Sequence, residues 1–174
     1  MPLPAVPVRQ LPANIEPLGD ATGFVDRIYS MLDNIELFED FERAEIQLLA
    51  HFMSVYRVPP ATEIIREGDA GDYMLLVIDG EFDIFKNDND GFRKRIAIVG
   101  AGKTLGEMSM IDGEPRFASC MAVRETVFAT LTRDNMAKII LEKPSLGAKV
   151  LVKLVTMLSQ RLRQTSIRLL QYMK

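Results

Sequence analysis

The chain has 174 residues, of which 48% are hydrophobic and 26% are charged, and its net charge is −3 at neutral pH. These values are typical of a globular protein with one well-formed core. The small negative charge gives no overall reason to expect a nucleic-acid partner. A single cysteine, Cys120, and a single histidine, His51, exclude an internal disulfide and a metal site built from several such ligands. No apolar run is long enough to cross a bilayer and no secretory signal is visible, so we expect a cytoplasmic protein without a transmembrane segment.

Residues 1–18 form a proline-rich arm, with prolines at Pro2, Pro4, Pro7, Pro12 and Pro17. Proline fixes φ and lacks an N–H group, so the arm cannot be a regular helix or a central strand. We expect an extended arm at 1–18, a body of strands with flanking helices at 19–144, and a separate C-terminal helix at 145–174.

Two helices are predicted after the arm. From Asp20 to Leu32, apolar residues recur at helical spacing, at Phe24, Ile28, Met31 and Leu32. A second helix is predicted over about 40–55, where the apolar stripe comprises Phe41, Ile46, Leu49, Phe52 and Met53. Two acidic residues, Glu42 and Glu45, are favourably placed near the start of this second helix.

From "RVPPAT" onward the pattern changes to short β-rich segments separated by glycines. The Asp79–Gly80 dipeptide lies between "YMLLVI" and "EFDIF" and is a hairpin signal, because the tight turn requires positive φ. Two more strands are predicted at "ASCMAV" and "TVFATLT". About eight strands at this spacing predict a mainly β fold, a compact antiparallel roll or jelly roll with flanking helices.

The C-terminal region is predicted to be helical. A short helix at "RDNMAKIILEK" should stop before Pro144, and Ser145 can cap a long helix that reaches about Tyr172. This long helix carries a heptad seam of Leu151, Val155, Leu158, Leu162, Thr165, Leu169 and Tyr172. Such a seam is a dimer interface or a stripe packed on the domain. Residues 149–174 carry six cations and no acid, which we interpret as the solvated flank of a dimer seam rather than a surface for an acidic partner or membrane.

The segment "LGEMSMIDGEPRFAS" at 105–119 has the chemistry of a sugar-phosphate site. Gly106 lets the backbone approach a ligand closely, and residues 108–112 could form one helical turn whose free N–H groups point at an anion. Arg116, fixed from behind by Pro115, offers a planar fork of donors to a phosphate. Glu107 can accept a hydrogen bond from a sugar hydroxyl. The alternative is an ion pair between Glu107 and Arg116 that ties a loop to the sheet.

In its context this segment resembles the phosphate-binding cassette of the cyclic nucleotide-binding domain family, which includes protein kinase A regulatory subunits and bacterial catabolite activator proteins. The matching features are Gly106-Glu107, an apolar residue at Met108, a small one at Ser109, the segment length, and Pro115-Arg116 followed by Ala118. Upstream, "IIREGDAGDYMLLVIDGEFDIF" is similar to the early part of the family's β-roll. The resemblance covers about residues 36–172 and implies an eight-stranded antiparallel β-roll with N-terminal helices and a long C-terminal helix.

The resemblance also implies roles for individual residues. Glu107 would hold the ribose 2′-hydroxyl and Arg116 the cyclic phosphate. The phosphate oxygens would also meet backbone N–H groups near Met108, Ser109, Phe117 and Ala118.

In catabolite activators the long helix carries an "R-L-x-x-T-S" segment, which "RLRQTS" matches here with Arg161, Thr165 and Ser166. The resemblance implies that the threonine and serine contact the adenine amino group across a dimer and that the arginine lies near the phosphate. The plainer alternative is a threonine-serine pair on a helix surface.

Two departures from the family pattern matter. Phe117 stands where activators have serine and cGMP-selective members have threonine; it keeps the backbone donor but loses the hydroxyl, so cGMP selectivity is not expected. Its ring could crowd the pocket or stack on a base. The chain stops at Lys174, where activators continue into a helix-turn-helix domain, so sequence-specific DNA binding is not expected.

The sequence therefore predicts a stand-alone cyclic nucleotide sensor, with cAMP as ligand and no other cofactor. It would be a homodimer through 145–172 and would signal to a partner protein through rearrangement of the C-terminal helix. The alternative is the same fold without cyclic mononucleotide binding, either a cyclic dinucleotide binder or a protein-interaction scaffold. No nucleophile–base set or paired carboxylates are evident, so we do not expect an enzyme.

Overall fold

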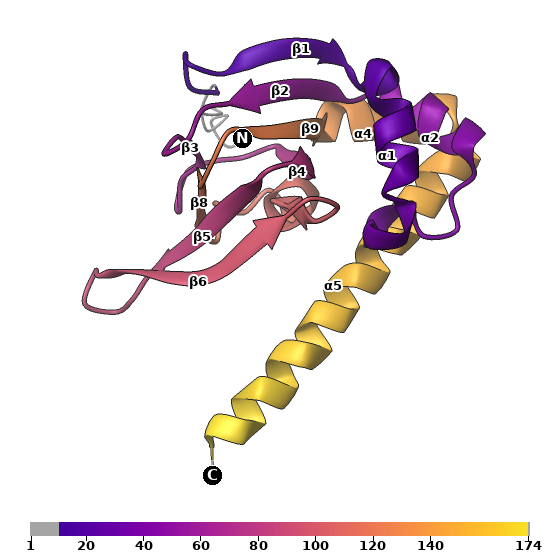
Figure 1. Ribbon diagram of the computed structural model, residues 1–174. Helices are drawn as coiled ribbons and strands as arrows, with labels where there is room; N and C mark the ends of the chain where they lie inside the picture. Colours follow the sequence, from indigo (N-terminus) through magenta and orange to yellow (C-terminus); the bar gives the residue numbers. More distant parts are fainter. Residues whose placement is uncertain (1–10, 174) are drawn as a thin grey trace, which may run out of the picture.

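The computed structural model describes residues 11–173; residues 1–10 of the arm, with Pro2, Pro4 and Pro7, and Lys174 lie outside the described residues. Two antiparallel sheets form a β-roll, and the helices gather at one side of it (Figure 1). The first sheet has the order β1 (Glu16–Asp20), β2 (Ser54–Val58), β9 (Thr126–Thr132), β4 (Tyr73–Asp79) and β7 (Thr104–Leu105). The second has the order β3 (Glu63–Ile65), β8 (Ser119–Ala122), β5 (Glu81–Asn87) and β6 (Arg93–Gly100).

Strand β4 lies at the centre of the molecule, between two hydrophobic cores. Its alternate residues Tyr73, Leu75 and Val77 belong to the core inside the roll. The residues between them, Met74, Leu76 and Ile78, belong to the core beneath the helices. Because side chains of a strand alternate between faces, a continuous apolar run such as "YMLLVI" is what a strand buried on both faces requires.

The predicted antiparallel β-roll with N-terminal helices and a long C-terminal helix is confirmed. The described residues contain nine strands rather than eight, because Glu16–Asp20 adds β1. This strand includes Pro17 and pairs only with β2, at the edge of the first sheet. The edge position agrees with the exclusion of a central strand from the proline-rich arm, since proline cannot donate to a ladder on both sides.

The connection at Asp79–Gly80 is not the hairpin that its sequence predicts. Gly80 has the positive φ that the turn signal requires, 98°, but β4 and β5 lie in different sheets. The strand that pairs with β5 across a short turn is β6, and the turn at 88–92 contains Gly91 with a φ of 83°. Turn chemistry determines where the chain reverses, whereas strand pairing depends on which sheet buries each face.

The N-terminal helices are shorter than predicted. The first predicted helix, at 20–32, is divided into the 3-10 helix η1 (Ala21–Phe24) and the α-helix α1 (Val25–Ser30). Two further 3-10 helices follow, η2 (Leu32–Asn34) and η3 (Glu36–Phe38). The predicted helix over 40–55 is limited to α2 (Arg43–Ala50), whose capping box is formed by Glu42 and Glu45. Residues from Ser54 onward form β2, because Val55 and Val58 are fully buried there and pair with β9. Sheet pairing overrides the helical spacing of this segment.

The C-terminal helices are α4 (Arg133–Glu142) and α5 (Pro144–Tyr172), with the predicted break between them and the predicted end of α5. The predicted cap at Ser145 is wrong, because α5 already begins at Pro144 and its N-cap is Lys143. Proline suits the first helical position, where the N–H group that it lacks would have no partner. Within residues 11–173, no helix combines the length and the apolar character needed to cross a bilayer.

Helix α5 has two apolar faces. One face is buried in the core beneath the helices and consists of Leu146, Gly147, Val150, Leu154 and Met157. The predicted seam lies elsewhere, and its members Leu151, Val155, Leu162, Leu169 and Tyr172 are exposed. The second half of α5 extends away from the body (Figure 1). A stripe packed on the domain therefore does not account for the seam in this chain.

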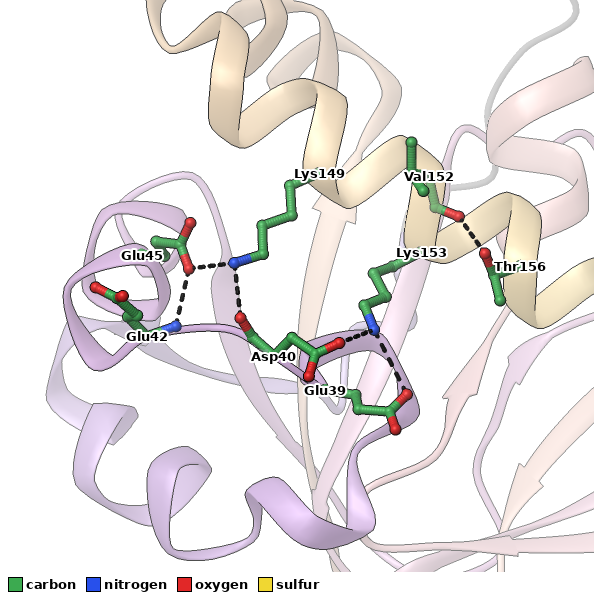
Figure 2. A network of polar contacts seen from close by, with 8 residues as sticks. All are labelled: Glu39, Asp40, Glu42, Glu45, Lys149, Val152, Lys153 and Thr156. Atoms are coloured by element: carbon green, nitrogen blue, oxygen red, sulfur yellow. Dashed lines mark hydrogen bonds and ion pairs between the residues drawn. The ribbon is translucent and has the colours of Figure 1, made fainter.

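Two lysines of α5 attach the first half of the helix to residues 39–45 (Figure 2). Lys149 Nζ lies 2.6 Å from Glu45 Oε2 and donates to the Asp40 carbonyl at 2.7 Å. Lys153 Nζ lies 2.9 Å from Asp40 Oδ2 and 3.5 Å from Glu39 Oε2. These hydrogen bonds lower the pKa of the carboxyl groups of Asp40 and Glu45. We call this set of contacts the lysine clamp.

The lysine clamp should make stability depend on pH in the acid range. Because the folded state lowers the pKa of Asp40 and Glu45 below 3.8 and 4.5, their contribution is present above those values and is lost as pH falls through the folded-state values. The double variant Lys149→Met/Lys153→Met should unfold a few degrees lower than the wild type at pH 7. That difference should shrink progressively as pH falls below about 4.5 toward 3.

Thermal unfolding measured between pH 7 and pH 3 checks this prediction. The control is Lys138→Met, which removes an exposed lysine of α4 that has no ion pair among the described residues. A difference between wild type and double variant that stays constant across this range would contradict a role for the two carboxylates.

Candidate functional site

The segment "LGEMSMIDGEPRFAS" connects β7 of the first sheet to β8 of the second. It leaves β7 at Gly106, whose φ of 79° turns the chain into the short helix α3 (Glu107–Asp112). Gly113, with a φ of 77°, ends that helix. The helical turn expected over 108–112 is therefore present. Arg133, the first residue of α4, holds the other end of α3 by donating to the carbonyls of Ser109 and Met110.

Arg116 is a buried cation without a counter-ion. Only 4% of the residue is exposed, and no ion pair involves it among the described residues. Its guanidinium carbon lies 4.5 Å from the centre of the Tyr73 ring, and Nη1 donates to the Gly106 carbonyl at 3.0 Å. Nη2 is buried and has no hydrogen-bond partner. Burial lowers the pKa of the guanidinium, and this effect outweighs the neighbouring groups that raise it, among them Tyr73 and Asp72.

Two glycines make room for this guanidinium. A Cβ at Gly71 would lie 1.9 Å from Arg116 Nε, and a Cβ at Gly106 would lie 2.6 Å from Nη1. The first glycine was not identified as a site residue from the sequence, although it stands in the glycine-rich "EGDAGD" before β4. Tyr73 was missed too, because its apolar strand context gives no sign that its ring underlies a cation.

Glu107 is also buried, with 3% of the residue exposed. Its Oε1 accepts a hydrogen bond from the Thr104 hydroxyl and lies 3.2 Å from Nη1 of Arg161 in α5. Its ion-pair partner is thus Arg161, and the described contacts contain no pair between Glu107 and Arg116. The alternative of a Glu107–Arg116 pair that ties the loop to the sheet is wrong for this structure.

Four backbone N–H groups of the segment 105–119 have no described partner. Among the described hydrogen bonds, none uses the N–H groups of Met108, Ser109, Phe117 or Ala118. These are the positions at which the family resemblance implied backbone donors to a phosphate. Unused N–H groups next to an uncompensated guanidinium form an arrangement that an anion can satisfy.

Phe117, the residue after Arg116, is 57% exposed. Lys86 Nζ lies 4.4 Å from the centre of its ring and donates to its carbonyl at 2.8 Å. The same Lys86 pairs with Glu67, which also accepts the N–H of Asn87. Among the predicted site residues, Phe117 and Met108 have large exposed side chains, whereas Glu107, Ser109 and Arg116 are buried.

The "RLRQTS" segment of α5 is only partly brought to the site. Arg161 reaches Glu107 and the Thr104 carbonyl. Thr165 and Ser166 are exposed, and their hydroxyls donate to the carbonyls of Arg161 and Leu162 in their own helix, each at 2.9 Å. The predicted contact of this pair with a ligand across a dimer stays a prediction.

Other parts of the molecule fit an anion less well. A groove of about 730 Å³ lies between residues 32–41 and α5, but its lining includes the carboxylates of Asp33, Glu36, Glu39 and Asp40. Such a surface repels a phosphate. Among the described residues no group of three or more acidic, histidine or cysteine side chains could hold a metal. Cys120 is buried, and burial raises the pKa of its thiol to about 12.

Several known proteins are similar to this chain in fold and in sequence. The profile of the cyclic nucleotide-binding domain family matches residues 55–143. A cyclic nucleotide-binding domain from Methylobacillus flagellatus is 40% identical, with a TM-score of 0.82 over 91% of this chain and 89% of that one. The cyclic AMP receptor protein of Thermus thermophilus is 29% identical over 76% of this chain, and a cAMP-dependent protein kinase regulatory subunit of Blastocladiella emersonii is 28% identical over 68%.

The chain belongs to the cyclic nucleotide-binding domain family. Its matched part spans 60% of the Thermus protein and 30% of the Blastocladiella protein. The expected family assignment is confirmed, and Arg116, Glu107 and the unused N–H groups lie in the cassette on which that expectation was based.

Proposed function

We propose that the protein is a regulatory sensor of a cyclic nucleotide and that its ligand is cAMP. The observation that carries this proposal is Arg116, a buried guanidinium whose Nη2 has no hydrogen-bond partner and which forms no ion pair among the described residues. An uncompensated buried charge costs several kcal/mol unless a counter-ion is supplied. A cyclic phosphate supplies a single negative charge and oxygens that can take both the guanidinium and the free N–H groups. The names of the Thermus and Blastocladiella relatives both refer to cAMP, which supports this choice of ligand.

Each site residue then has a role in binding. Arg116 and the N–H groups of Met108, Ser109, Phe117 and Ala118 hold the cyclic phosphate. Glu107 accepts the ribose 2′-hydroxyl, and Gly106 allows the backbone to approach. The Thr104 hydroxyl and Arg161 fix the orientation of the Glu107 carboxylate in the free protein.

The ion pair between Glu107 and Arg161 is the route by which binding reaches α5. A ligand hydroxyl that donates to the Glu107 carboxylate competes with Arg161 for it. Binding therefore changes the ion pair that attaches the middle of α5 to the site. Arg133 provides a second link, from α3 to the start of α4. Because a ligand shifts an equilibrium only by its difference in affinity between two states, the C-terminal helix or the hinge near 133–147 must move for signalling. The rearranged helix passes the signal to a partner protein, and the protein is a regulator rather than an enzyme.

We further propose a homodimer through residues 145–172. The exposed seam of α5 gives two copies an apolar surface to bury, and Thr165 and Ser166 then face the ligand site of the partner copy. Thr165 is polar at a seam position where an apolar residue would stabilise the dimer more. A contact of Thr165 and Ser166 with the base would explain why polar residues stand there. The cytoplasmic location and the absence of sequence-specific DNA binding stay predictions.

The dimer proposal predicts the effect of a charge in the seam. Leu162→Asp should weaken self-association by about 100-fold or more, because a carboxylate on each copy would be buried against the other. Sedimentation over a range of concentrations measures this change. Gln164→Asp, which places the same charge on another exposed position of α5, is the control and should change association little. Equal behaviour of both variants would contradict the seam as the interface.

A second candidate function follows from Phe117. If its exposed ring blocks a cyclic mononucleotide, the same fold serves as a cyclic dinucleotide binder or as a protein-interaction scaffold. The exposed position of Phe117 beside Arg116 is the observation that favours this alternative.

Calorimetric titration with cAMP, cGMP and cyclic di-GMP tests the two functions. The proposal expects cAMP to bind with the highest affinity and cGMP less tightly, because Phe117 offers no hydroxyl to the guanine. Failure of cAMP to bind at millimolar concentration would overturn the proposal. Binding of cyclic di-GMP alone would favour the alternative.

A further inference from the structure

We infer that the ring of Phe117, held in place by Lys86, is a wall of the ligand site on which the nucleobase stacks. This inference rests on the proposed function and assigns to this site a way of recognising the base.

The position of Lys86 places the ring at the site. Side chains alternate along β5, and Phe82 and Ile84, two and four residues before Lys86, are buried inside the roll. Lys86 therefore lies on the inner face of this sheet. Since the Phe117 ring lies against Lys86 Nζ, the ring also lies on this inner side. Its neighbour Arg116 contacts the ring of Tyr73, another residue of the same inner core.

The ring is exposed yet fixed. Lys86 contacts both the ring and the carbonyl of Phe117, and Glu67 fixes Lys86 through an ion pair. Glu67 is itself fixed by the N–H of Asn87, and Lys86 lowers the pKa of its carboxyl. An aromatic ring held at one face by an ammonium group keeps the other face for a second planar group. Little conformational entropy is then lost when a base stacks on it.

A bound cyclic nucleotide would bring its base close to the Phe117 ring. A cyclic nucleotide whose phosphate binds Arg116 must place its base within a few ångströms of that residue. Stacking a base on an aromatic ring is worth a factor of about 10 in affinity and is tolerant of base identity. Phe117 lacks the hydroxyl that serine or threonine would offer at this position. In its place, the ring makes a stacking contact with the flat face of the base.

The test compares cAMP with ribose 3′,5′-cyclic phosphate, a probe that keeps the sugar and phosphate but has no base. Phe117→Leu should weaken cAMP binding about 10-fold and leave the affinity for the base-free probe unchanged. Lys86→Met keeps the apolar stem and removes the ammonium; it should also weaken cAMP, by a smaller factor, without affecting the probe. Phe92→Ala removes another exposed ring, 69% exposed on the β5–β6 turn, and should change neither affinity.

The outcomes separate this inference from the proposed function. If the wild type binds no cyclic nucleotide, the proposed function fails and the inference fails with it. If the wild type binds cAMP and Phe117→Leu binds equally well or better, the ring is a spectator or an obstruction, and only the inference is overturned. Equal weakening of cAMP and the base-free probe would mean that Phe117 or Lys86 acts on the phosphate, which also overturns stacking.

Discussion

Replacing Arg116 with leucine should weaken cAMP binding by about 100-fold or more, because the substitution removes the charged hydrogen bonds that only the phosphate completes. The same substitution should leave the stability of the ligand-free protein unchanged or raise it, by up to about 2 kcal/mol. The reason is that Arg116 is buried, forms no ion pair among the described residues and has one donor atom without a partner there. Such a cost is expected of a residue whose charge is compensated only when the ligand phosphate is bound, because function and stability then make opposite demands on it.

Calorimetric titration and thermal unfolding with and without cAMP measure both effects. In Arg116→Leu, the rise in Tm that ligand causes in the wild type should disappear. Arg27→Leu, which removes an exposed arginine of α1 without an ion pair among the described residues, controls for the loss of one positive charge. A fall in stability of several kcal/mol in Arg116→Leu would show that the guanidinium is a structural element, and unchanged binding would place the ligand elsewhere.

The substitution Gly71→Ala should weaken cAMP binding by roughly 10-fold to 100-fold while the fold remains intact. The new methyl group would lie 1.9 Å from Arg116 Nε and 2.3 Å from the guanidinium carbon. These atoms are at the far end of a flexible side chain, so the guanidinium can move aside at small cost to stability. A displaced guanidinium no longer meets the phosphate together with the N–H groups of the cassette.

The matched control is Gly100→Ala, because the nearest atom to its new Cβ is 3.9 Å away. Both variants should unfold at temperatures near that of the wild type, and only Gly71→Ala should lose affinity in the titration. Loss of the folded state in Gly71→Ala would mean that the guanidinium cannot move. Unchanged affinity would mean that the phosphate does not depend on its position.

The fold could be predicted from the sequence wherever the pattern was local. The apolar run of β4 and the break before Pro144 each express a requirement of one segment. The predictions that failed concern pairing. The turn at Asp79–Gly80 joins strands of different sheets, and residues from Ser54 form a strand because β9 lies beside them. In both cases the pairing strand could not be read from the residues around the segment.

The candidate site divides in the same way. The segment 105–118 by itself determined the chemistry: a glycine that turns the chain, a short helix with free N–H groups, a carboxylate and a guanidinium. These properties follow from residue types and their spacing along one loop.

Only the tertiary structure decided which groups are paired. It assigned Arg161, more than fifty residues away in sequence, to Glu107, and it left Arg116 buried over Tyr73 between two glycines. It also placed Lys86 against Phe117. Burial and charge compensation depend on distant elements that pack together, so the sequence could show that Glu107 and Arg116 share a loop but not that they stay apart.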